Sequence, residues 1–356
     1  MKSIKVMLFL LLSLIAAAHS RGRKNIHCYS NTIVVHQKSK KRYYVKNIPK
    51  LIKRISLEST FDSTVYKPNF CRFDNSGSVY MIDYSTFYIH KFSPITSTNS
   101  YSHSYFGNGS GEGPGELVRP VDLEIYDGKL FIVDEARGCI VVHTTEGKHV
   151  KDIRLSDYTM PRKITIISGK MIIEPMQYHK NELFHVYDIN GKFLYSFGNY
   201  IDNKNVNNGI YHDNYILKYS ENRFLYTPLY LGIIGLYEGK KLILAKNTID
   251  GFKEVKTIKK EVIKGLYAKK IDKKYITANG VACNDKHIVL SAVELNYKEG
   301  NKWFCDIYDK KNLDYVGSVQ LPEYSTFFDI QGNLYAGISK GYLYIFDMTS
   351  VLSGVG

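Results

Sequence analysis

A short apolar run that follows a turn signal recurs six times along this chain of 356 residues, and this repeat limits the possible folds more than any other feature. The runs are NSGSVYMID, YDGKLFIVD, ISGKMIIEP, SENRFLYTP, NDKHIVLSA and IQGNLYAGI, which end at Asp83, Asp134, Pro175, Pro228, Ala292 and Ile338. Successive ends lie 51, 41, 53, 64 and 46 residues apart. A spacing in this range indicates a repeat architecture in which each unit packs against its neighbours.

Three of the units continue into further strands joined by tight reversals. Their sequences are CIVVHTTEGKHVKDIRL, LFHVYDINGKFLYSFG and FCDIYDKKNLDYVGSVQL. The dipeptides Glu146-Gly147 and Asn190-Gly191 supply the positive φ angles that short hairpin turns require. Each unit is therefore predicted to be a four-stranded antiparallel meander, and six such meanders fit a β-propeller, in which radial repetition protects the sheet edges.

The two ends of the chain predict how the ring closes. The last unit, Phe327 to Met348, has room for only two or three strands, whereas Leu51 to Ser59 is a strand-like segment that precedes the first unit. We predict that this N-terminal strand pairs into the last blade as its outer strand. Helical periodicity is confined to Val255 to Tyr267, in a long interval where we expect an insertion. The predicted fold is an all-β, six-bladed propeller over residues 49–356.

The first 20 residues have the pattern of a signal peptide. Lys2 and Lys5 precede an apolar stretch from Val6 to Ala18, and Ala18-His19-Ser20 offers a cleavage site. A membrane anchor, the alternative, needs about 20 apolar residues, and this stretch is shorter. We therefore expect a signal peptide over residues 1–20 and a basic N-terminal segment over residues 21–48. The mature chain is expected to have no transmembrane segment and to be exported to the periplasm or cell surface.

The chain is strongly basic, with a formal net charge of +14. Its cations concentrate in two blocks, Lys38 to Arg54 and Phe252 to Lys274. An anionic surface as partner is one explanation, and a solvated lysine-rich surface is the other. No nucleic-acid-binding motif is present, so nucleic acid is not an expected partner. Of the five cysteines, Cys283 and Cys305 flank one predicted hairpin and are the candidate disulfide, with buried free thiols as the alternative.

The stretch FGNGSGEGPGE, residues 106–116, contains five glycines and invites comparison with phosphate-binding loops. A P-loop needs a lysine after its last glycine, and no lysine follows Gly115. A dinucleotide-binding loop needs a helix to follow, whereas Pro120 and a strand-like segment follow here. The stretch is therefore predicted to connect one blade to the next through tight backbone conformations.

The second repeat resembles that of six-bladed NHL-like and TolB-like propellers, a type common among secreted bacterial proteins. Gly111, Gly113, Pro114 and Gly115 are similar to the glycine-rich start of that repeat, followed by Pro120. Leu130 to Asp134 resembles its second strand, and Ile140 with Gly147-Lys148 resembles its third strand and turn. The match weakens in the later repeats, where Pro175, Pro228 and Ala292 replace the strand-end aspartate. The resemblance implies the propeller fold and does not identify an activity, because propellers support many functions.

In this architecture the loops that lead into the inner strands and the turns after the second strands crowd round one mouth of the channel. We expect a non-catalytic site there that binds a protein, peptide or glycan of the cell envelope, with no cofactor. The 30 tyrosines suit such contacts, although strands also use tyrosine for packing. The residues predicted to line this mouth are Asp83, Tyr84, Arg119, Glu135, Arg137, Gln177, Tyr178, His179, Lys180 and Tyr230.

The alternative is a metal-dependent lactonase, hydrolase or lyase with calcium or zinc in the channel. Its candidate ligands are Asp83, Asp134, Glu174 and His179, because carboxylate oxygens and imidazole nitrogens hold these ions. Lactonase-type propellers hold a divalent ion in the channel, as this alternative would require, but they draw ligands from most blades. Strand-end aspartates more often accept hydrogen bonds from nearby backbone amides. We therefore expect Asp83 and Asp134 to be structural.

Overall fold

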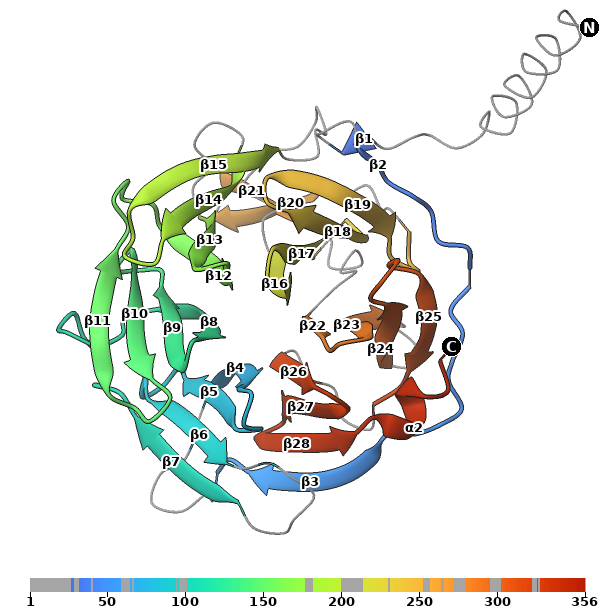
Figure 1. Ribbon diagram of the computed structural model, residues 1–356, viewed down its shortest axis with the longest axis horizontal. Coiled ribbons are helices and arrows are strands. Elements are labelled where there is room, and N and C mark those ends of the chain that lie inside the picture. Colours follow the sequence, from blue (N-terminus) through green and yellow to red (C-terminus); the bar gives the residue numbers. More distant parts are fainter. Residues whose placement is uncertain are drawn as a thin grey trace, which may run out of the picture.

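Six four-stranded antiparallel sheets are arranged as blades around a central axis (Figure 1). The computed structural model describes residues 27–28, 32–39, 41–58, 65, 67–93, 95, 101–176, 182–199, 214–229, 231–251, 257–263, 266–271, 280–294, 302–321, 325 and 327–355. The predicted signal peptide lies outside these residues. The arrangement confirms the predicted six-bladed propeller.

Each blade runs outward from an inner strand, in chain order. The first three blades are β4 (Pro68–Phe73), β5 (Val79–Asp83), β6 (Ile89–Ser93) and β7 (Ser102–Phe106); β8 (Pro120–Tyr126), β9 (Lys129–Asp134), β10 (Cys139–Thr144) and β11 (His149–Arg154); and β12 (Pro161–Ile167), β13 (Lys170–Pro175), β14 (Glu182–Asp188) and β15 (Phe193–Asn199). The last three are β16 (Asn214–Ser220), β17 (Arg223–Pro228), β18 (Ile233–Glu238) and β19 (Lys241–Asn247); β22 (Val281–Cys283), β23 (His287–Glu294), β24 (Lys302–Asp309) and β25 (Tyr315–Val319); and β26 (Phe327–Gln331), β27 (Leu334–Ser339), β28 (Tyr342–Asp347) and β3 (Lys50–Ser56).

The ring closes through β3, the N-terminal strand, as predicted. This strand pairs antiparallel with β28, and Ile55 lies opposite Leu343. Both side chains are buried in one apolar cluster that blades 1 and 6 share. Closure by the N-terminal strand joins the two ends of the domain, so the last blade gains its outer strand from a segment about 290 residues away along the chain.

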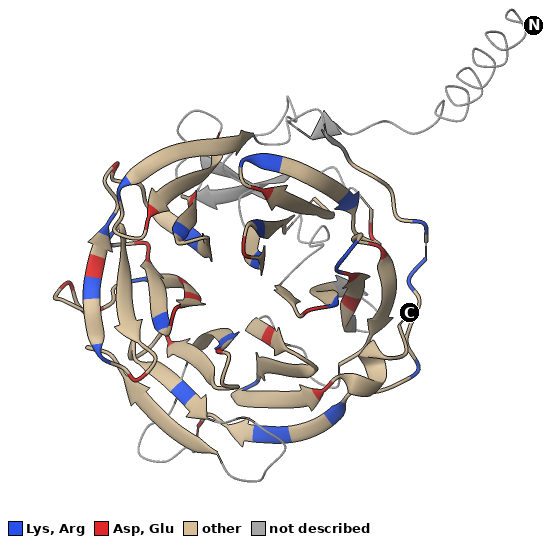
Figure 2. Ribbon diagram, viewed as in Figure 1, with Lys and Arg blue, Asp and Glu red and all other residues tan. Residues whose placement is uncertain are grey.

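Residues 34–39 and 41–48, here called the strap, run along the outer strands of blades 4 and 5 before entering β3 (Figure 2). The Val35 amide donates to the Ala245 carbonyl at 2.9 Å, and the Val45 amide donates to the Ser318 carbonyl at 2.8 Å. The strap therefore covers the outer edges of β19 and β25 with parallel backbone bridges. Much of the predicted basic N-terminal segment is thus packed against the propeller.

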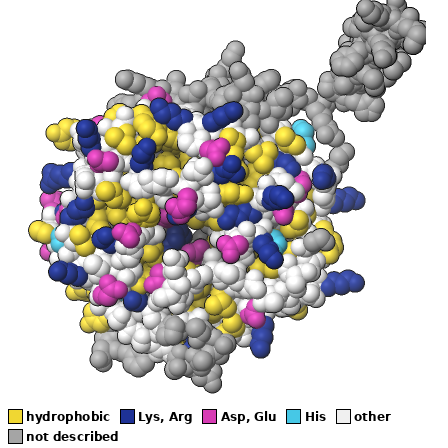
Figure 3. All heavy atoms as spheres, viewed as in Figure 1, with side chains coloured by type: hydrophobic (Ala, Val, Ile, Leu, Met, Phe, Trp, Pro, Cys, Tyr) yellow, Lys and Arg dark blue, Asp and Glu magenta, His cyan; other side chains and the backbone are white. Residues whose placement is uncertain are grey.

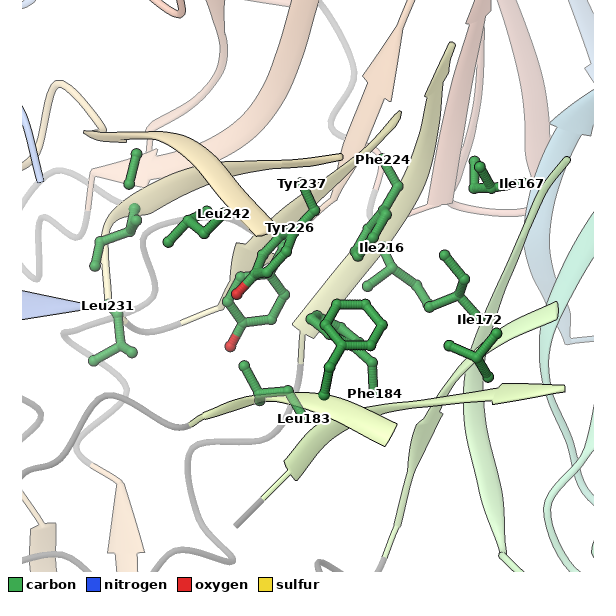
Figure 4. Packing of buried hydrophobic residues seen from close by; sticks show 14 of the residues in the cluster. Ile167, Ile172, Leu183, Phe184, Ile216, Phe224, Tyr226, Leu231, Tyr237 and Leu242 are labelled. Atoms are coloured by element: carbon green, nitrogen blue, oxygen red, sulfur yellow. The ribbon is translucent and has the colours of Figure 1, made fainter. Parts of the chain in front are cut away.

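Apolar and aromatic side chains fill the spaces between neighbouring blades. Between blades 3 and 4, Phe184 lies edge-on to Phe224 with ring centroids 5.2 Å apart, and Tyr237 stacks on Phe224 (Figure 4). Tyr187 and Tyr335 are also buried. These positions account for part of the tyrosine content as strand packing rather than as a binding surface.

The candidate helical periodicity of Val255 to Tyr267 does not produce a helix in the described residues. The described part of this interval forms a hairpin of β20 (Thr257–Ile263) and β21 (Leu266–Ile271), a two-stranded sheet separate from the blades. The sequence TIKKEVI has β-branched residues and an alternating pattern, which are compatible with a strand as well as with a helix. Pairing of β20 with β21 selects the strand. The prediction that this interval is an insertion is confirmed, because it lies between blades 4 and 5.

A few further elements complete the described structure. A short pair, β1 (His27–Cys28) and β2 (Thr32–Ile33), precedes the strap, and the helix α2 (Thr349–Leu352) follows the last blade. Among the residues that the structure describes, no helix has the length and hydropathy needed to cross a lipid bilayer. Cys283 and Cys305, the candidate disulfide pair, are both free thiols.

Candidate functional site

A cavity of about 620 Å³ lies at the mouth of the channel where the inner strands turn into the second strands. This volume is in the range of small-ligand and peptide-side-chain pockets. Five of the six blades contribute to its wall, and blade 3 contributes nothing. The lining residues are Arg72, Phe73, Asp74, Asn75, Glu124, Ile125, Tyr126, Asp127, Leu217, Lys218, Tyr219, Glu221, Cys283, Asn284, Asp285, Lys310, Asp329, Ile330, Gln331 and Gly332.

Carboxylates on the inner strands join one blade to the next at this cavity. An Asp329 carboxylate oxygen, on β26, accepts a hydrogen bond from the Phe73 amide of the neighbouring inner strand β4 at 2.9 Å. Asp122, on β8, accepts one from the Ile164 amide of β12 at 3.0 Å. Inner strands expose one edge to the channel, so their amides need partners from outside the sheet. These acidic residues meet that need.

Arg72 is the cation placed among these carboxylates. Its guanidinium Nη2 lies 3.6 Å from a carboxylate oxygen of Asp122. Burial opposes the charge of Arg72, but the carboxylates of Asp122, Asp329 and Glu124 raise its pKa above the usual value. Burial also raises the pKa of Asp329, while Arg72 acts to lower it. One guanidinium thus faces three carboxyl groups at the base of the cavity.

Glu124 is the carboxyl group most affected by this environment. Its side chain is buried, and burial raises its pKa to about 8, with Asp122 and Asp329 adding to the rise and Arg72 opposing it. The protonated form therefore predominates at neutral pH. A neutral carboxyl group at the cavity base can donate a hydrogen bond as well as accept one.

The rim of the cavity is more acidic than basic. The lining includes six carboxyl groups and three cationic groups. Lys218 is paired with Glu221 at 2.7 Å, and the Lys310 ammonium donates to the Asn284 carbonyl at 2.8 Å. Figure 3 shows acidic and basic side chains side by side around the hollowed centre of the disc. With Glu124 protonated, five carboxylates remain against three cations, so the cavity presents an excess of negative charge.

Three of the predicted site residues do meet at the opposite mouth. Arg119 Nε lies 2.8 Å from a Glu135 carboxylate oxygen, and Arg162 Nε lies 4.0 Å from the other. Tyr84 lies near this pair, because both charges act on it. Burial and then the charge of Glu135 raise the pKa of Tyr84, and the charge of Arg119 lowers it. The Arg119 side chain is 47% exposed, so this pair is a surface ion pair rather than a pocket.

Asp83 and Asp134 cap loops, as expected for strand-end aspartates. Asp83 accepts hydrogen bonds from the Lys67 and Ser85 amides at 3.0 and 2.9 Å. Asp134 accepts from the Val118 and Arg119 amides at 2.8 and 3.1 Å. Both carboxylates are fully buried, so they hold the loops of the predicted mouth and do not line it.

The predicted place of Arg137 at the channel mouth is wrong. Its guanidinium contacts the Asp152 carboxylate of the outer half of the blade at 2.7 Å and donates to the Glu116 carbonyl of the glycine-rich stretch. The turn after β9 directs this side chain toward the connection between β7 and β8. There the Asp152 carboxylate and the Glu112 and Glu116 carbonyls accept its hydrogen bonds. Gln177, Tyr178, His179, Lys180 and Tyr230 lie outside the described residues.

The glycine-rich stretch connects β7 to β8, as predicted. Gly107, Gly109, Gly111 and Gly115 have positive φ angles. The Gly113 amide donates to Glu116, and the Gly115 amide lies 3.3 Å from an Asp152 oxygen. These amides are already used within the protein, so they form a connection and not a phosphate cradle.

The candidate metal ligands are separated in the described structure. The Glu174 carboxylate, buried in blade 3, accepts a hydrogen bond from the Asn214 side chain at 2.6 Å. Across the described residues, no three His, Cys, Asp or Glu side chains lie close enough together to hold a metal ion. His179 is not among those residues.

The cavity lies at the mouth opposite to the one where most of the candidate residues were predicted, although the sequence contains a signal for it. Asp122 and Glu124 alternate with apolar residues in PVDLEIY, and Asp329 interrupts the strand FFDIQ. Charged residues inside a predicted inner strand are costly unless they have partners across the channel. Which blades supply those partners depends on the closure of the ring.

The Glu124 carboxyl group predicts a pH dependence of stability. Its folded pKa of about 8 exceeds that of an unfolded chain, so the folded protein holds an extra proton between about pH 4.5 and pH 8. The free energy of unfolding should therefore fall as pH rises through this window, by up to about 1.4 kcal/mol per unit. In Glu124→Gln this contribution should disappear. Urea unfolding across the window would measure it, with Glu112→Gln as an exposed control, and parallel profiles for the two variants would contradict it.

The comparisons with known proteins identify a fold. No protein-family model matches the sequence, and no curated protein sequence matches it. A solved structure from Bacteroides fragilis, named "putative exported protein", is similar with 10% identity and a TM-score of 0.58 over 88% of this chain and 98% of that one. A member of the DUF4221 family from Bacteroides vulgatus is similar with 10% identity and a TM-score of 0.56, over 86% and 98% of the two chains. At this identity the likeness is one of fold alone.

Proposed function

We propose that this protein is an exported, non-catalytic propeller of the NHL-like or TolB-like type that binds a cationic peptide segment of a cell-envelope protein in its central cavity. The observation that carries the proposal is the excess of acidic groups around a cavity of about 620 Å³, which has five carboxylates and the protonated Glu124 against three cations. The chain as a whole has a net charge of +14, so the cavity has the opposite sign to the rest of the protein.

The chemistry of the cavity supports a lysine or arginine side chain as its occupant. Carboxylates on the rim attract the cation over a distance, and a mouth with one sign of charge in excess concentrates the matching ligand. At the base, the Asp329 carboxylate offers acceptor oxygens, and charge-assisted hydrogen bonds to a carboxylate are stronger than neutral ones. The rings of Tyr126 and Tyr219 on the wall already face lysines of this chain, with Lys218 Nζ 5.9 Å and Lys310 Nζ 4.8 Å from the ring centroids, so the acidic groups alone support a cationic occupant.

Export is supported by the signal-peptide pattern and by the name of the Bacteroides fragilis protein of similar fold. In the periplasm or at the cell surface, the partner would be an envelope protein with a lysine-rich or arginine-rich loop or terminus.

A fluorescent oligolysine peptide and an oligoglutamate peptide of equal length would test the proposal by anisotropy at low ionic strength. Oligolysine should bind the chain that begins at Arg21. The triple variant Asp127→Asn, Glu221→Gln and Asp285→Asn should weaken oligolysine binding at least about tenfold, because three exposed rim charges are lost.

The matched control removes three exposed carboxylates outside the cavity, by Glu58→Gln, Glu112→Gln and Glu146→Gln. It should change oligolysine binding less than about twofold. If oligolysine does not bind, or if both triple variants weaken it equally, the cavity is not the cation site.

A further inference from the structure

A second surface, on the rim of the disc, has the opposite charge to the cavity. The sequence contains no Asp or Glu before Glu58, so the strap and β3 carry no carboxylate through Leu57 (Figure 2). Lys and Arg side chains recur along this stretch and reach solvent. The exposed cations are Lys38, Lys41, Lys46, Lys50 and Arg54.

Acidic side chains from neighbouring elements cancel only part of this charge. Asp250 and Asp306 are both bound by Arg42, at 2.9 and 2.8 Å. Asp314 is shared by Lys246 at 2.6 Å and Lys38 at 3.5 Å. Asp347, opposite Lys50 in the sheet, accepts hydrogen bonds from Thr349 and interacts electrostatically with Lys50, whereas the strap cations Lys41 and Lys46 have no acidic partner among the described residues. The acids next to the strap are therefore engaged at its inner side, and Lys41 and Lys46 project from it.

The same stretch exposes large apolar side chains between its cations. Tyr43 is 54% exposed, Tyr44 47%, Ile48 72% and Leu51 47%. Beside them is a groove of about 390 Å³ between the strap and the end of β25, with Val45 and Leu321 in its wall. Isolated apolar residues on a surface need no explanation, but four within nine residues, alternating with lysines, do.

We infer that this rim surface, formed by residues 41–54, docks the protein on an anionic lipid membrane. Lysines near a bilayer are attracted to acidic headgroups, while tyrosine and aliphatic side chains enter the interface below them. A soluble polyanion would use the lysines alone and would leave Ile48 and Leu51 in water. The combination of both residue types therefore favours a lipid surface over an acidic glycan. The inference is independent of the proposed function, because the cavity lies on the channel axis and this surface on the rim.

Flotation of the chain beginning at Arg21 with two kinds of vesicle tests the inference. This form is used because the apolar residues 6–18 would bind lipid by themselves. Vesicles of phosphatidylcholine mixed with phosphatidylglycerol should bind the protein, and vesicles of phosphatidylcholine alone should not. Lys41→Ala, Lys46→Ala and Lys50→Ala together should weaken binding on the order of a hundredfold, at roughly fivefold for each lysine.

The matched charge control is Lys148→Ala, Lys170→Ala and Lys192→Ala, three exposed lysines in blades 2 and 3. It should bind nearly as the parent does. An equal loss in both triple variants would overturn the inference in favour of a general effect of net charge, as would equal binding to the two kinds of vesicle.

A second pair of variants separates a membrane from a soluble polyanion. Ile48→Asn should weaken vesicle binding by roughly fivefold and leave binding to heparin unchanged, because only the membrane receives the aliphatic side chain. The control is Val150→Asn, at an apolar residue 42% exposed on β11. If Ile48→Asn binds vesicles as the parent does, and heparin displaces both, the surface recognises a polyanion and the inference fails.

Discussion

Replacing Arg42 with alanine is expected to lower the free energy of unfolding by about 3 to 5 kcal/mol, the range for a buried ion pair that loses one partner. The Arg42 guanidinium makes two bonds to the Asp306 carboxylate, at 3.0 and 2.8 Å, and one to Asp250 at 2.9 Å. It also lies over the Phe304 ring at 4.1 Å. The Asp306 side chain is only 1% exposed, so the variant leaves a charge that water cannot reach.

The pH dependence of this variant provides a second readout. Burial raises the pKa of Asp306, and Arg42 is the main group that lowers it again. Without Arg42 the folded pKa should rise further above the unfolded one. When the folded pKa of a carboxyl group lies above its unfolded pKa, the free energy of unfolding of the protein falls as pH rises. The difference in this free energy between Arg42→Ala and the parent should therefore narrow in acid.

Lys41→Ala is the matched control, because it removes one exposed cation from the adjacent position of the strap. It should change the free energy of unfolding by less than about 0.5 kcal/mol. Adding Asp306→Asn to the Arg42 variant should restore part of the loss. A loss in Arg42→Ala no larger than that in Lys41→Ala, measured by urea unfolding, would show that the strap is not held by this pair.

Replacing Arg72 with methionine is expected to cost about 2 to 3 kcal/mol of unfolding free energy. Methionine keeps much of the side-chain volume but leaves Asp122, Glu124 and Asp329 without their cation. The cost should be below that of a fully buried pair, because 17% of the Arg72 side chain is exposed and its distance to Asp122 is 3.6 Å. The cost should grow as pH rises, since the carboxyl groups then ionise against one another.

The control for this variant is Arg154→Met, which removes an exposed arginine from the outer strand β11. Thermal and urea unfolding should show little change for it. Glu124→Gln added to Arg72→Met should recover stability at high pH, because the glutamine cannot ionise. Equal stability of Arg72→Met and Arg154→Met across the pH range would mean that the three carboxyl groups do not depend on Arg72.

The ion pairs of Arg42 and Arg72 stabilise two different charged regions of the propeller. Arg42 fixes the strap, from which exposed lysines project, and Arg72 balances the acidic base of the cavity on the axis. Both arginines act within the protein. The side chains proposed to meet a partner or a membrane are the exposed ones around them.

The sequence alone determined the architecture, because the features that encode it are local. Apolar runs such as YDGKLFIVD and turn pairs such as Asn190-Gly191 define strands and reversals within a few residues. Counting the units also predicted closure by the N-terminal strand, since the last unit was too short for a blade. The capping role of Asp83 and Asp134 followed in the same way from their positions at strand ends.

The tertiary structure decided what depends on neighbours distant in the sequence. TIKKEVI fits a helix or a strand by its own pattern, and pairing with β21 selects the strand. Arg137 turns away from the channel because Asp152 lies on the outer side of the same blade. The cavity is formed by residues from five blades, spread from Arg72 to Gly332. Its carboxyl groups become a site only when the closed ring brings the inner strands together, because electrostatic interaction depends on distance in space and not along the chain.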